Sequence, residues 1–290
     1  MTIPKVSDMQ ITGDVEAIID RALAEDLGLG DPTTDILIPQ DLEGEAVLVA
    51  RESGVLAGLD VGLAVFKRVD ALLETDAFAS DGATVESATR LATVRGRVAS
   101  ILKAERTVVN FIQHLSGIAT ETRRYVDAAA GHRARIVDTR KTTPGLRQLE
   151  KQAVRAGGGV NHRQNLGDGI LIKDNHIEAA ADQGMSIGDA VKKAKQNASH
   201  TIRVEVEVEN LGQLQQVLDA GAEIVLLDNM DVELMTRAVE MCRGRAVTEA
   251  SGGITLETVR DVAATGVDII SVGALTHSVK ALDVSLDMVR

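Results

Sequence analysis

The chain has 290 residues, a net charge of -12 and a hydrophobic content of 44%, which is ordinary for a folded domain. Aromatic residues make up only 1% of the sequence. The aromatic platforms of single-strand nucleic-acid binders are therefore scarce, and the acidic balance argues against any nucleic-acid partner. The start of the chain has no signal-peptide core, and no apolar run reaches about 18 residues. We therefore expect a cytoplasmic protein without a membrane partner.

The first part of the chain mixes helices and strands. Apolar residues at helical spacing predict helices over residues 14–27 and 61–73, and a long helical stretch over 100–130 that breaks near Gly117. Residues 25–34 form a turn-rich exit from the first helix. Strand-like runs occupy 46–51, 55–56 and 91–98. This mixture predicts an α+β domain of about a hundred residues.

After Arg133 the pattern becomes regular, because strands and helices alternate. The expected strands are 135–138, 169–173, 203–208, 223–228, 246–250 and 268–272. The expected helices are 145–157, 186–197, 211–221, 231–243 and 255–265, the last with Thr255 as its N-cap. Such alternation predicts right-handed βαβ units and a parallel sheet. Six strands fall short of the eight of a full barrel, so an incomplete barrel and an open doubly wound sheet both remain possible, and the polar strand ends favour the barrel.

A basic segment stands out within this acidic protein. Residues 133–173 hold nine Lys and Arg against three Asp and Glu, which indicates a small, multiply anionic ligand. Arg140 and Lys141 follow the first strand closely, and Lys173 ends the second. Arginine presents a planar fork of donors that suits carboxylates and phosphates, and His162 beside Arg163 could add a donor or a proton. On the helix between the two strands, the cations at 147, 151 and 155 are interpreted as an exposed stripe.

Carboxylates and glycines follow the later strands. Alternation places Glu205, Glu207 and Glu209 on one side of the third strand, and Asp228 ends the fourth. Glu205 and Asp228 could bind sugar hydroxyls, hold Mg²⁺ or stabilise developing positive charge, unless they only pair with neighbouring cations. Glycines at 252, 253 and 273 suit a phosphate monoester, although plain tight turns would also explain them.

Other reactive residue types are assigned structural roles. Cys242 is the single cysteine, which excludes an internal disulfide, and its place in a helix indicates a buried thiol. His176 and His277 have no metal-ligand spacing and are interpreted as hydrogen-bonded structural residues.

Taken together, these segments resemble the quinolinate phosphoribosyltransferases, also called nicotinate-nucleotide pyrophosphorylases (carboxylating). The resemblance runs through EDLG at 25–28, DPTT at 31–34, ERT at 105–107, NF at 110–111, LSGIAT at 115–120, DTRKTTPGLR at 138–147, GGGVNHR at 157–163, LIKDNH at 171–176, EVEVEN at 205–210, LLDN at 226–229, EASGG at 249–253 and SVGALTHS at 271–278. The residues at 108 and 152 depart from the family pattern, but neither is assigned to the chemistry.

The resemblance implies an α/β fold with two domains. An N-terminal α/β sandwich would cover residues 1–116 and be rejoined by about 276–290, and an incomplete, open α/β barrel of parallel strands would cover 117–275 and carry the active site. It also implies a homodimer in which Arg106 reaches the active site of the partner subunit.

The implied reaction joins quinolinate to phosphoribosyl pyrophosphate with Mg²⁺, giving nicotinate mononucleotide, pyrophosphate and CO₂ in NAD biosynthesis. Quinolinate would be held by Arg106, Thr139, Arg140, His162 and Arg163, with Arg51 as a weaker candidate at the rim. Pyrophosphate would meet Lys141 and Lys173. Ribose and Mg²⁺ would meet Glu205 and Asp228, and the 5′-phosphate would meet Ser251, Gly252, Gly253 and Gly273.

Two alternatives remain open. One is a related barrel enzyme that acts on nicotinate. Nicotinate has a single carboxylate, so its binding site would need fewer cations than a site for the dianion quinolinate. The other is a catalytically silent ligand-binding homologue, which should have lost at least one of the cations or carboxylates at the strand ends.

Overall fold

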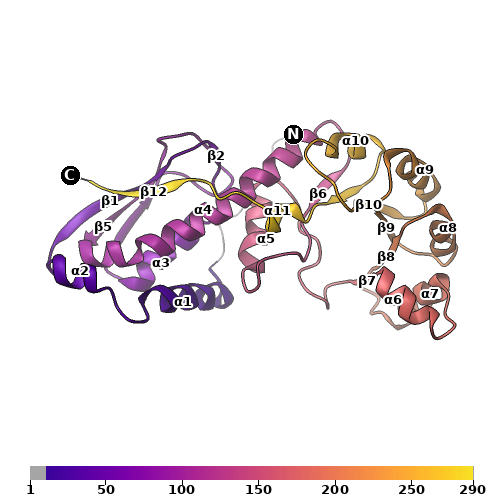
Figure 1. Ribbon diagram of the computed structural model, residues 1–290, viewed down its shortest axis with the longest axis horizontal. Coiled ribbons are helices and arrows are strands. Elements are labelled where there is room, and N and C mark those ends of the chain that lie inside the picture. Colours follow the sequence, from indigo (N-terminus) through magenta and orange to yellow (C-terminus); the bar gives the residue numbers. More distant parts are fainter. Residues whose placement is uncertain (1–10, 290) are drawn as a thin grey trace. The chain divides into compact units, whose positions relative to one another are not determined.

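A computed structural model of the chain describes residues 11–289. They divide into two compact units, shown in Figure 1. The N-terminal unit comprises residues up to 123, 142–159 and those from 274 onward, and the parallel-sheet unit comprises 124–141 and 160–273. Residues 142–159, expected in the barrel domain, thus group with the N-terminal unit. Among the described residues, no helix is both long and apolar enough to cross a membrane.

The N-terminal unit is built on an antiparallel sheet with strand order β12-β1-β5-β3. Its strands are β1 (Glu43–Ala50), β3 (Glu74–Ala77), β5 (Arg90–Arg97) and β12 (Val284–Met288), and a small sheet pairs β2 (Gly54–Val55) with β4 (Thr84–Val85). Its helices are α1 (Gly13–Leu27), α2 (Pro32–Leu37), α3 (Leu59–Val69), α5 (Arg147–Ala156) and α11 (Ala274–His277). Because β12 pairs with β1, the last residues of the chain belong to this sheet.

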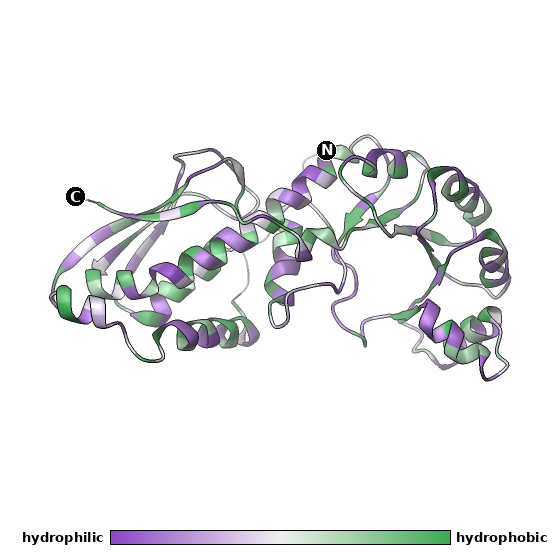
Figure 2. Cartoon of the chain, viewed as in Figure 1, coloured by the Kyte–Doolittle hydropathy of each residue, from purple (hydrophilic) through white to green (hydrophobic). Residues whose placement is uncertain are grey.

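Helix α4 (Val98–Ala128) is continuous, so the predicted break at Gly117 is wrong. A side chain at position 117 would collide with the backbone carbonyl of Lys280. The glycine therefore serves close packing of the helix against the C-terminal segment rather than a bend. Residues such as Ile101, Val108 and Ile112 are buried, and Figure 2 shows hydrophobic and hydrophilic residues alternating along the helix. This is the amphipathic pattern from which the helix was predicted.

The second unit holds a six-stranded parallel sheet with strand order β6-β11-β10-β9-β8-β7. Its strands are β6 (Arg135–Val137), β7 (Ile170–Ile172), β8 (Val204–Val208), β9 (Ile224–Asp228), β10 (Val247–Ser251) and β11 (Ile269–Ser271). Its helices are α6 (Asp174–Ala181), α7 (Ile187–Asn197), α8 (Leu211–Asp219), α9 (Val232–Cys242) and α10 (Val259–Ala264).

The strand order decides between the two architectures that the sequence left open. From β7 to β11 each strand pairs with the next one along the chain, and the order never reverses as it does in a doubly wound sheet. Right-handed crossovers in one constant direction place the connecting helices on one face, as Figure 1 shows for α8, α9 and α10. The expected mixed α/β fold with an incomplete, open barrel is therefore confirmed.

Several local expectations were wrong. Helix α2 replaces the expected turn region, because Asp31 caps its start and Pro32 fits the first turn. Helix α10 begins after Thr258 rather than Thr255. The cations at 147, 151 and 155 on α5 do not form an exposed stripe, because Lys151 is only 1% exposed. Most residues of this short helix are buried, so its charge pattern does not predict which face is exposed.

Candidate active site

The carboxyl edge of the parallel sheet gathers three charged side chains, Lys173, Glu207 and Asp228, which we call the edge cluster. Lys173 follows β7, and its Nζ donates to Oε2 of Glu207 at 2.7 Å. Glu207 is 7% exposed. Asp228 ends β9, and its pKa is raised by burial and by the charge of Glu207, although Lys173 opposes this. The cluster therefore holds two carboxylates around one ammonium group.

The backbone beside Asp228 is strained. Asn229 adopts a left-handed conformation with a φ of 52°, and its Nδ2 donates to Oδ2 of Asp228 at 2.6 Å. Ser251 lies opposite Asp228 on the neighbouring strand. Gly252 has a φ of 90°, and any side chain there would overlap the Asn229 amide. Only glycine fits at this close approach, and such strained positions cluster at functional sites.

A second polar group lies deeper in the sheet, and we call it the inner layer: His162, Glu205 and Glu249. Nε2 of His162 lies 3.3 Å from Oε2 of Glu205 and 3.5 Å from Oε2 of Glu249. Both carboxylates are buried. A cavity of about 400 Å³ lined by this layer also includes residues from the amino ends of the strands, such as Arg135 and Arg203.

The hydrogen-bond contacts of His162 indicate which atoms of the inner layer carry protons. Burial lowers the pKa of His162, but hydrogen bonds to Glu205 and Glu249 outweigh it and raise that pKa to about 10. The backbone N–H of Arg163 nevertheless donates to Nδ1 of His162 at 2.8 Å, which requires a lone pair there. Groups coupled this closely titrate together, so the raised value belongs to the layer as a whole. The contact at Nδ1 leaves the ring proton on Nε2 and the additional proton on the two carboxylates. Burial and the neighbouring Glu249 charge raise the pKa of Glu205, in agreement.

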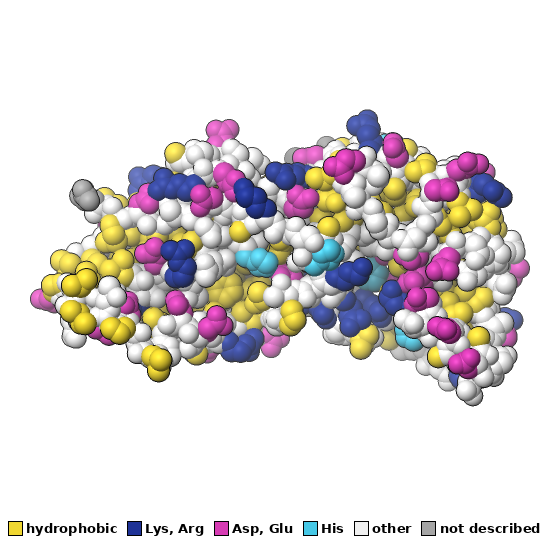
Figure 3. Space-filling view, in the orientation of Figure 1, with side chains coloured by type: hydrophobic (Ala, Val, Ile, Leu, Met, Phe, Trp, Pro, Cys, Tyr) yellow, Lys and Arg dark blue, Asp and Glu magenta, His cyan; other side chains and the backbone are white. Residues whose placement is uncertain are grey.

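Two further cations of the basic segment, Arg140 and Arg163, lie near β6, the strand at the opposite end of the sheet from β7. Val160 pairs with Val137 of β6, and buried Asp138 accepts hydrogen bonds from Asn161 Nδ2 at 2.6 Å and from the backbone N–H of His162 at 2.8 Å. This brings Arg163 beside Arg140: burial, and then the charge of Arg140, lower the pKa of Arg163. Figure 3 shows Lys and Arg side chains gathered near Asp and Glu on the face in view.

The remaining expected residues have these positions. Thr139 Oγ1 accepts from the backbone N–H of Lys141 at 3.0 Å. Gly253 has a φ of 59°, and Gly273 directly precedes α11. Arg51 donates to Ser285 and to Asp287, at 2.8 and 2.7 Å, so the structure engages it with the C-terminal strand β12.

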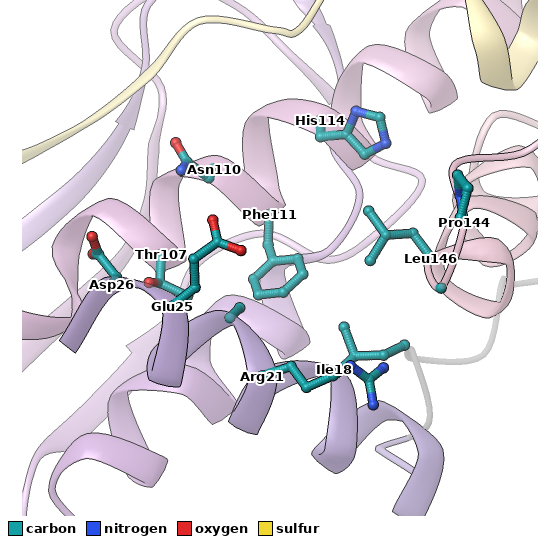
Figure 4. Close-up of a pocket in the computed structure, with 12 residues that line it drawn as sticks. Ile18, Arg21, Glu25, Asp26, Thr107, Asn110, Phe111, His114, Pro144 and Leu146 are labelled. Carbon is teal, nitrogen blue, oxygen red and sulfur yellow. The ribbon is translucent and has the colours of Figure 1, made fainter. Parts of the chain in front are cut away.

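Arg106 lies on α4 in the N-terminal unit, and its side chain is 63% exposed. The same helix lines a pocket of about 480 Å³ in that unit. Figure 4 shows Asn110, Phe111 and His114 of α4 facing this pocket across from α1, with Pro144 and Leu146 closing one side. Buried Glu150 holds this side together, because it accepts from His114 Nε2 at 2.9 Å and from the backbone N–H of Thr143 at 3.1 Å.

The structure regroups the acidic residues chosen from the sequence. Glu205 was paired with Asp228, but it contacts His162. The acidic groups that act on Asp228 are Glu207 and, less strongly, Glu209. Glu249 was not chosen at all. Alternation had already placed Glu205 and Glu207 on one face, so the sequence contained the signal for Glu207. It had no signal for the depth at which each residue sits.

The structural histidines and the cysteine behave as expected. His176 Nδ1 accepts from the backbone N–H of Lys173 at 3.0 Å at the start of α6, and His277 Nδ1 lies 2.6 Å from Ser278 Oγ. Cys242 is buried, and burial raises the pKa of its thiol to about 11, so it is not a reactive nucleophile.

Adjacent cations and carboxylates at the carboxyl edge of an open α/β barrel define an enzyme that acts on small, multiply anionic substrates. The family models for the N-terminal and C-terminal domains of quinolinate phosphoribosyl transferase match residues 31–116 and 118–287. The chain therefore belongs to the quinolinate phosphoribosyltransferase family, as its motifs indicated.

Individual relatives agree. Quinolinate phosphoribosyltransferase [decarboxylating] 2b, mitochondrial, from Nicotiana tabacum is 44% identical over 95% of this chain and 82% of its own length. A probable nicotinate-nucleotide pyrophosphorylase [carboxylating] from Bacillus subtilis is 43% identical over 94% of this chain and 93% of its own. The solved nicotinate-nucleotide pyrophosphorylase from Francisella tularensis has a TM-score of 0.89 and 40% identity, covering 98% of this chain and 100% of its own.

Proposed function

We propose that this chain transfers the phosphoribosyl group of phosphoribosyl pyrophosphate to quinolinate, with decarboxylation, giving nicotinate mononucleotide, pyrophosphate and CO₂ in NAD biosynthesis. Family membership over nearly the whole chain supports this reaction. The observation that carries it is the position of Arg163 close to Arg140, whose charge, after burial, lowers the pKa of Arg163. Two neighbouring guanidinium groups suit a dianion, and quinolinate carries two neighbouring carboxylates.

The edge cluster suits the ribose and pyrophosphate of the second substrate. Lys173, with Lys141, would neutralise pyrophosphate oxygens as the bond to ribose breaks. Glu207 and Asp228 would accept hydrogen bonds from ribose hydroxyls and stabilise the positive charge that develops on the sugar. We assign Glu207 this role in place of Glu205, because Glu205 is engaged with His162.

The 5′-phosphate would lie against Ser251, Gly252, Gly253 and Gly273. The left-handed glycines at 252 and 253 leave room for backbone N–H groups to approach phosphate oxygens. Helix α10 starts at Val259, six residues beyond Gly253. The backbone of the turn, rather than the helix dipole, would therefore supply most of the binding.

Decarboxylation requires little from the protein. When the ring nitrogen of quinolinate attacks the ribose carbon, pyrophosphate leaves and the nitrogen becomes cationic. The adjacent carboxylate can then depart as CO₂, because the electron pair left on the ring carbon is stabilised by that nitrogen until a proton arrives. Arg140 and Arg163 hold the two carboxylates and so orient the nitrogen toward the sugar.

Mg²⁺ is part of this proposal. Glu207 and Asp228 offer carboxylate oxygens, the ligands that Mg²⁺ prefers. Burial raises the pKa of Asp228, and repulsion from Glu207 raises it further. A bound Mg²⁺ would relieve this repulsion and neutralise pyrophosphate. These two residues would hold it, rather than Glu205 and Asp228 as the sequence suggested.

A product assay tests the reaction. Purified protein is incubated with phosphoribosyl pyrophosphate and Mg²⁺, with quinolinate or nicotinate in separate tubes. We expect mononucleotide and CO₂ from quinolinate alone. Turnover of nicotinate without CO₂ would show the related monoacid activity instead, and tight quinolinate binding without any product would show a silent homologue.

We also propose a homodimer in which Arg106 reaches the active site of the partner subunit. Its exposed position on α4 supports this assignment. Arg106→Ala and Arg140→Ala should each be inactive or nearly so, but a mixture of the two should recover activity, because a hybrid dimer holds one intact site. No recovery despite demonstrated subunit exchange would contradict a shared site.

The compartment remains a proposal as well. The sequence favours the cytoplasm, whereas the tobacco relative is named as a mitochondrial protein. Fractionation of the source cells, followed by immunodetection of the chain beside a cytoplasmic marker, tests this. Recovery with a membrane or organelle fraction would contradict the proposal.

A further inference from the structure

The inner layer has no task in the reaction described so far, although it contains two buried carboxylates. We propose that Glu205 and Glu249 are positioning residues that fix the ring of His162 and, through that ring, the backbone of Arg163. This inference rests on the proposed function, because Arg163 is there assigned to the carboxylates of quinolinate. It extends the specificity-determining part of the site to Glu249 of β10, which lines the same cavity as Arg163.

The contacts form a continuous chain. Oε2 atoms of Glu205 and Glu249 both accept from Nε2 of His162, at 3.3 and 3.5 Å. Nδ1 of His162 accepts from the backbone N–H of Arg163 at 2.8 Å. Nη1 of Arg163 donates to the carbonyl of Gly169 at 3.0 Å. Both ring nitrogens are thus occupied, and rotation of the ring would release the backbone that carries the guanidinium group.

The direction of these contacts changes the expected role of His162. Neither ring nitrogen is directed to a substrate carboxylate, because Nε2 faces the two carboxylates and Nδ1 faces the backbone. The histidine therefore acts on quinolinate through Arg163, as a rigid spacer between the buried acids and the binding cation. A hydrogen-bonded second shell of this kind is what holds binding groups in place.

Each carboxylate of the inner layer has one buried oxygen without a hydrogen-bond donor among the described residues. Oε1 of Glu205 and Oε1 of Glu249 are buried and accept no hydrogen bond from any residue in the described range. Buried carboxylate oxygens need a donor, and an amide at position 249 could supply one to its neighbour Glu205. A neutral amide should then replace one member of the pair, whereas an apolar side chain of similar size should not.

A metal ion is the competing occupant, because one atom each from His162, Glu205 and Glu249 lie within 4.8 Å of one another. A histidine that binds metal through Nε2 normally donates its other N–H to an acceptor. Here Nδ1 accepts instead, so the ring proton resides on Nε2 and that atom has no lone pair for a metal. The geometry favours the hydrogen-bonded layer.

The test compares two substitutions at one position in the full-length protein. Glu249→Met removes the acceptor at similar size, and Glu249→Gln keeps the shape and an acceptor oxygen. We expect Glu249→Met to raise KM for quinolinate at least tenfold while KM for phosphoribosyl pyrophosphate stays within twofold. Glu249→Gln should keep KM for quinolinate within threefold of the wild-type value.

Thr248→Val is the matched control. It lies one residue earlier on β10, points to the opposite face, and loses a hydrogen bond from its hydroxyl to Asp268 of 2.9 Å. It should lose stability without changing KM for quinolinate. An increase in KM equal to that of Glu249→Met would mean that any damage to β10 has this effect, and would overturn the positioning role.

Two further readouts keep the inference testable if Glu249→Met does not fold. Nitrogen NMR of His162 in the wild type and in Glu249→Gln should show the proton on Nε2 and none on Nδ1; a protonated Nδ1 would overturn the inference. Dialysis of the wild type against Mn²⁺ or Zn²⁺ should leave no ion that depends on Glu249. One equivalent of metal, lost in Glu249→Gln, would show that the layer is a metal site.

Failure of the proposed function would be recognised separately. If the wild type forms no product from quinolinate, the reaction is wrong, but calorimetric binding of quinolinate to wild type, Glu249→Met and Glu249→Gln still reports on the layer. Equal quinolinate affinity in all three proteins, with the wild type active, would overturn only the positioning role.

Discussion

The edge cluster and the inner layer use the same kind of residue on the same strand for different purposes. Glu207 and Glu205 are two residues apart on β8, face the same side and are almost equally buried, at 7% and 6%. Glu207 meets the ammonium group of Lys173. Glu205 meets a histidine and a second carboxylate. Burial and alternation therefore do not distinguish these two carboxylates, whereas the groups that they contact do.

This difference sets what each region can do. The edge cluster combines an ammonium group with two carboxyl groups, which suits it to neutralise or stabilise charge that appears on a substrate. The inner layer lowers the cost of two buried acids by retaining protons, so it can only hold neighbouring groups in place. Substitutions in the first region should change turnover, and substitutions in the second should change binding geometry and the pH dependence of stability.

The largest effect is expected from Glu207→Gln. The substitution leaves Lys173 without its carboxylate partner and removes one of the two negative charges at the edge, so kcat/KM should fall by about 100-fold, the scale of losing one electrostatic contact in the transition state. Steady-state kinetics with both substrates measures this. The melting temperature should stay close to that of the wild type. Unchanged turnover would transfer the catalytic role back to Glu205.

Arg140→Ala should have the next largest effect. It removes one of the two cations that we assign to the carboxylates of quinolinate, so quinolinate affinity should fall by at least about 2 kcal/mol, the usual scale for a charge-assisted contact. Isothermal calorimetry with quinolinate alone measures this without turnover. Lys151→Met, on helix α5 of the N-terminal unit, is a control for the loss of a cation that is not assigned to the substrate. Wild-type affinity in Arg140→Ala would remove this residue from the carboxylate site.

The inner layer should reveal itself in the pH dependence of stability. The pKa of His162 is raised from 6.5 to about 10, so the folded layer retains a proton that the unfolded chain has lost. Its contribution is complete below pH 6.5 and is lost as the pH rises toward 10. Stability should decline by up to about 1.4 kcal/mol per pH unit for one proton in this window. Urea unfolding across the window measures the slope.

Glu249→Gln sharpens that measurement. It removes one of the carboxylates that raise the pKa of His162, so the slope should become shallower while Glu207→Gln leaves it unchanged. Equal slopes in the wild type and Glu249→Gln would mean that groups outside the inner layer cause the decline. The comparison of the two glutamines thus separates the inner layer from the edge cluster by stability alone.

The sequence predicted the regular elements well because their signal is local. Period-two and period-3.6 apolar patterns specify the six parallel strands and most helices, and each strand end is read directly from the polar residue that follows. The parallel sheet was therefore predicted closely. The motifs then supplied the family, because their order along the chain is more specific than any single one of them.

What the sequence could not give depends on residues distant in the chain. Gly117 looked like a helix break, because nothing local shows that Lys280 packs against it. Lys151 was expected to be exposed, because the spacing of charges along a helix does not show that other parts of the chain cover the charged face. Glu249 escaped notice, because its importance comes from its distance to His162, a property of the folded sheet. Depth within a barrel is a tertiary quantity, and no periodicity along one strand contains it.

The smallest effect concerns Asp228, and it tests whether the edge cluster is one unit. Burial raises the pKa of Asp228 first, and the charge of Glu207 raises it further. Glu207→Gln should lower that pKa without returning it to the ordinary value, because the burial remains. Glu205→Gln should leave it nearly unchanged, since Glu205 is not among the charges acting on Asp228. Carbon NMR of the Asp228 carboxyl group across a pH titration gives both values. An equal change in the pKa of Asp228 in both variants would mean that Glu205 and Glu207 act on Asp228 equally. That result would contradict the distinction between the edge cluster and the inner layer.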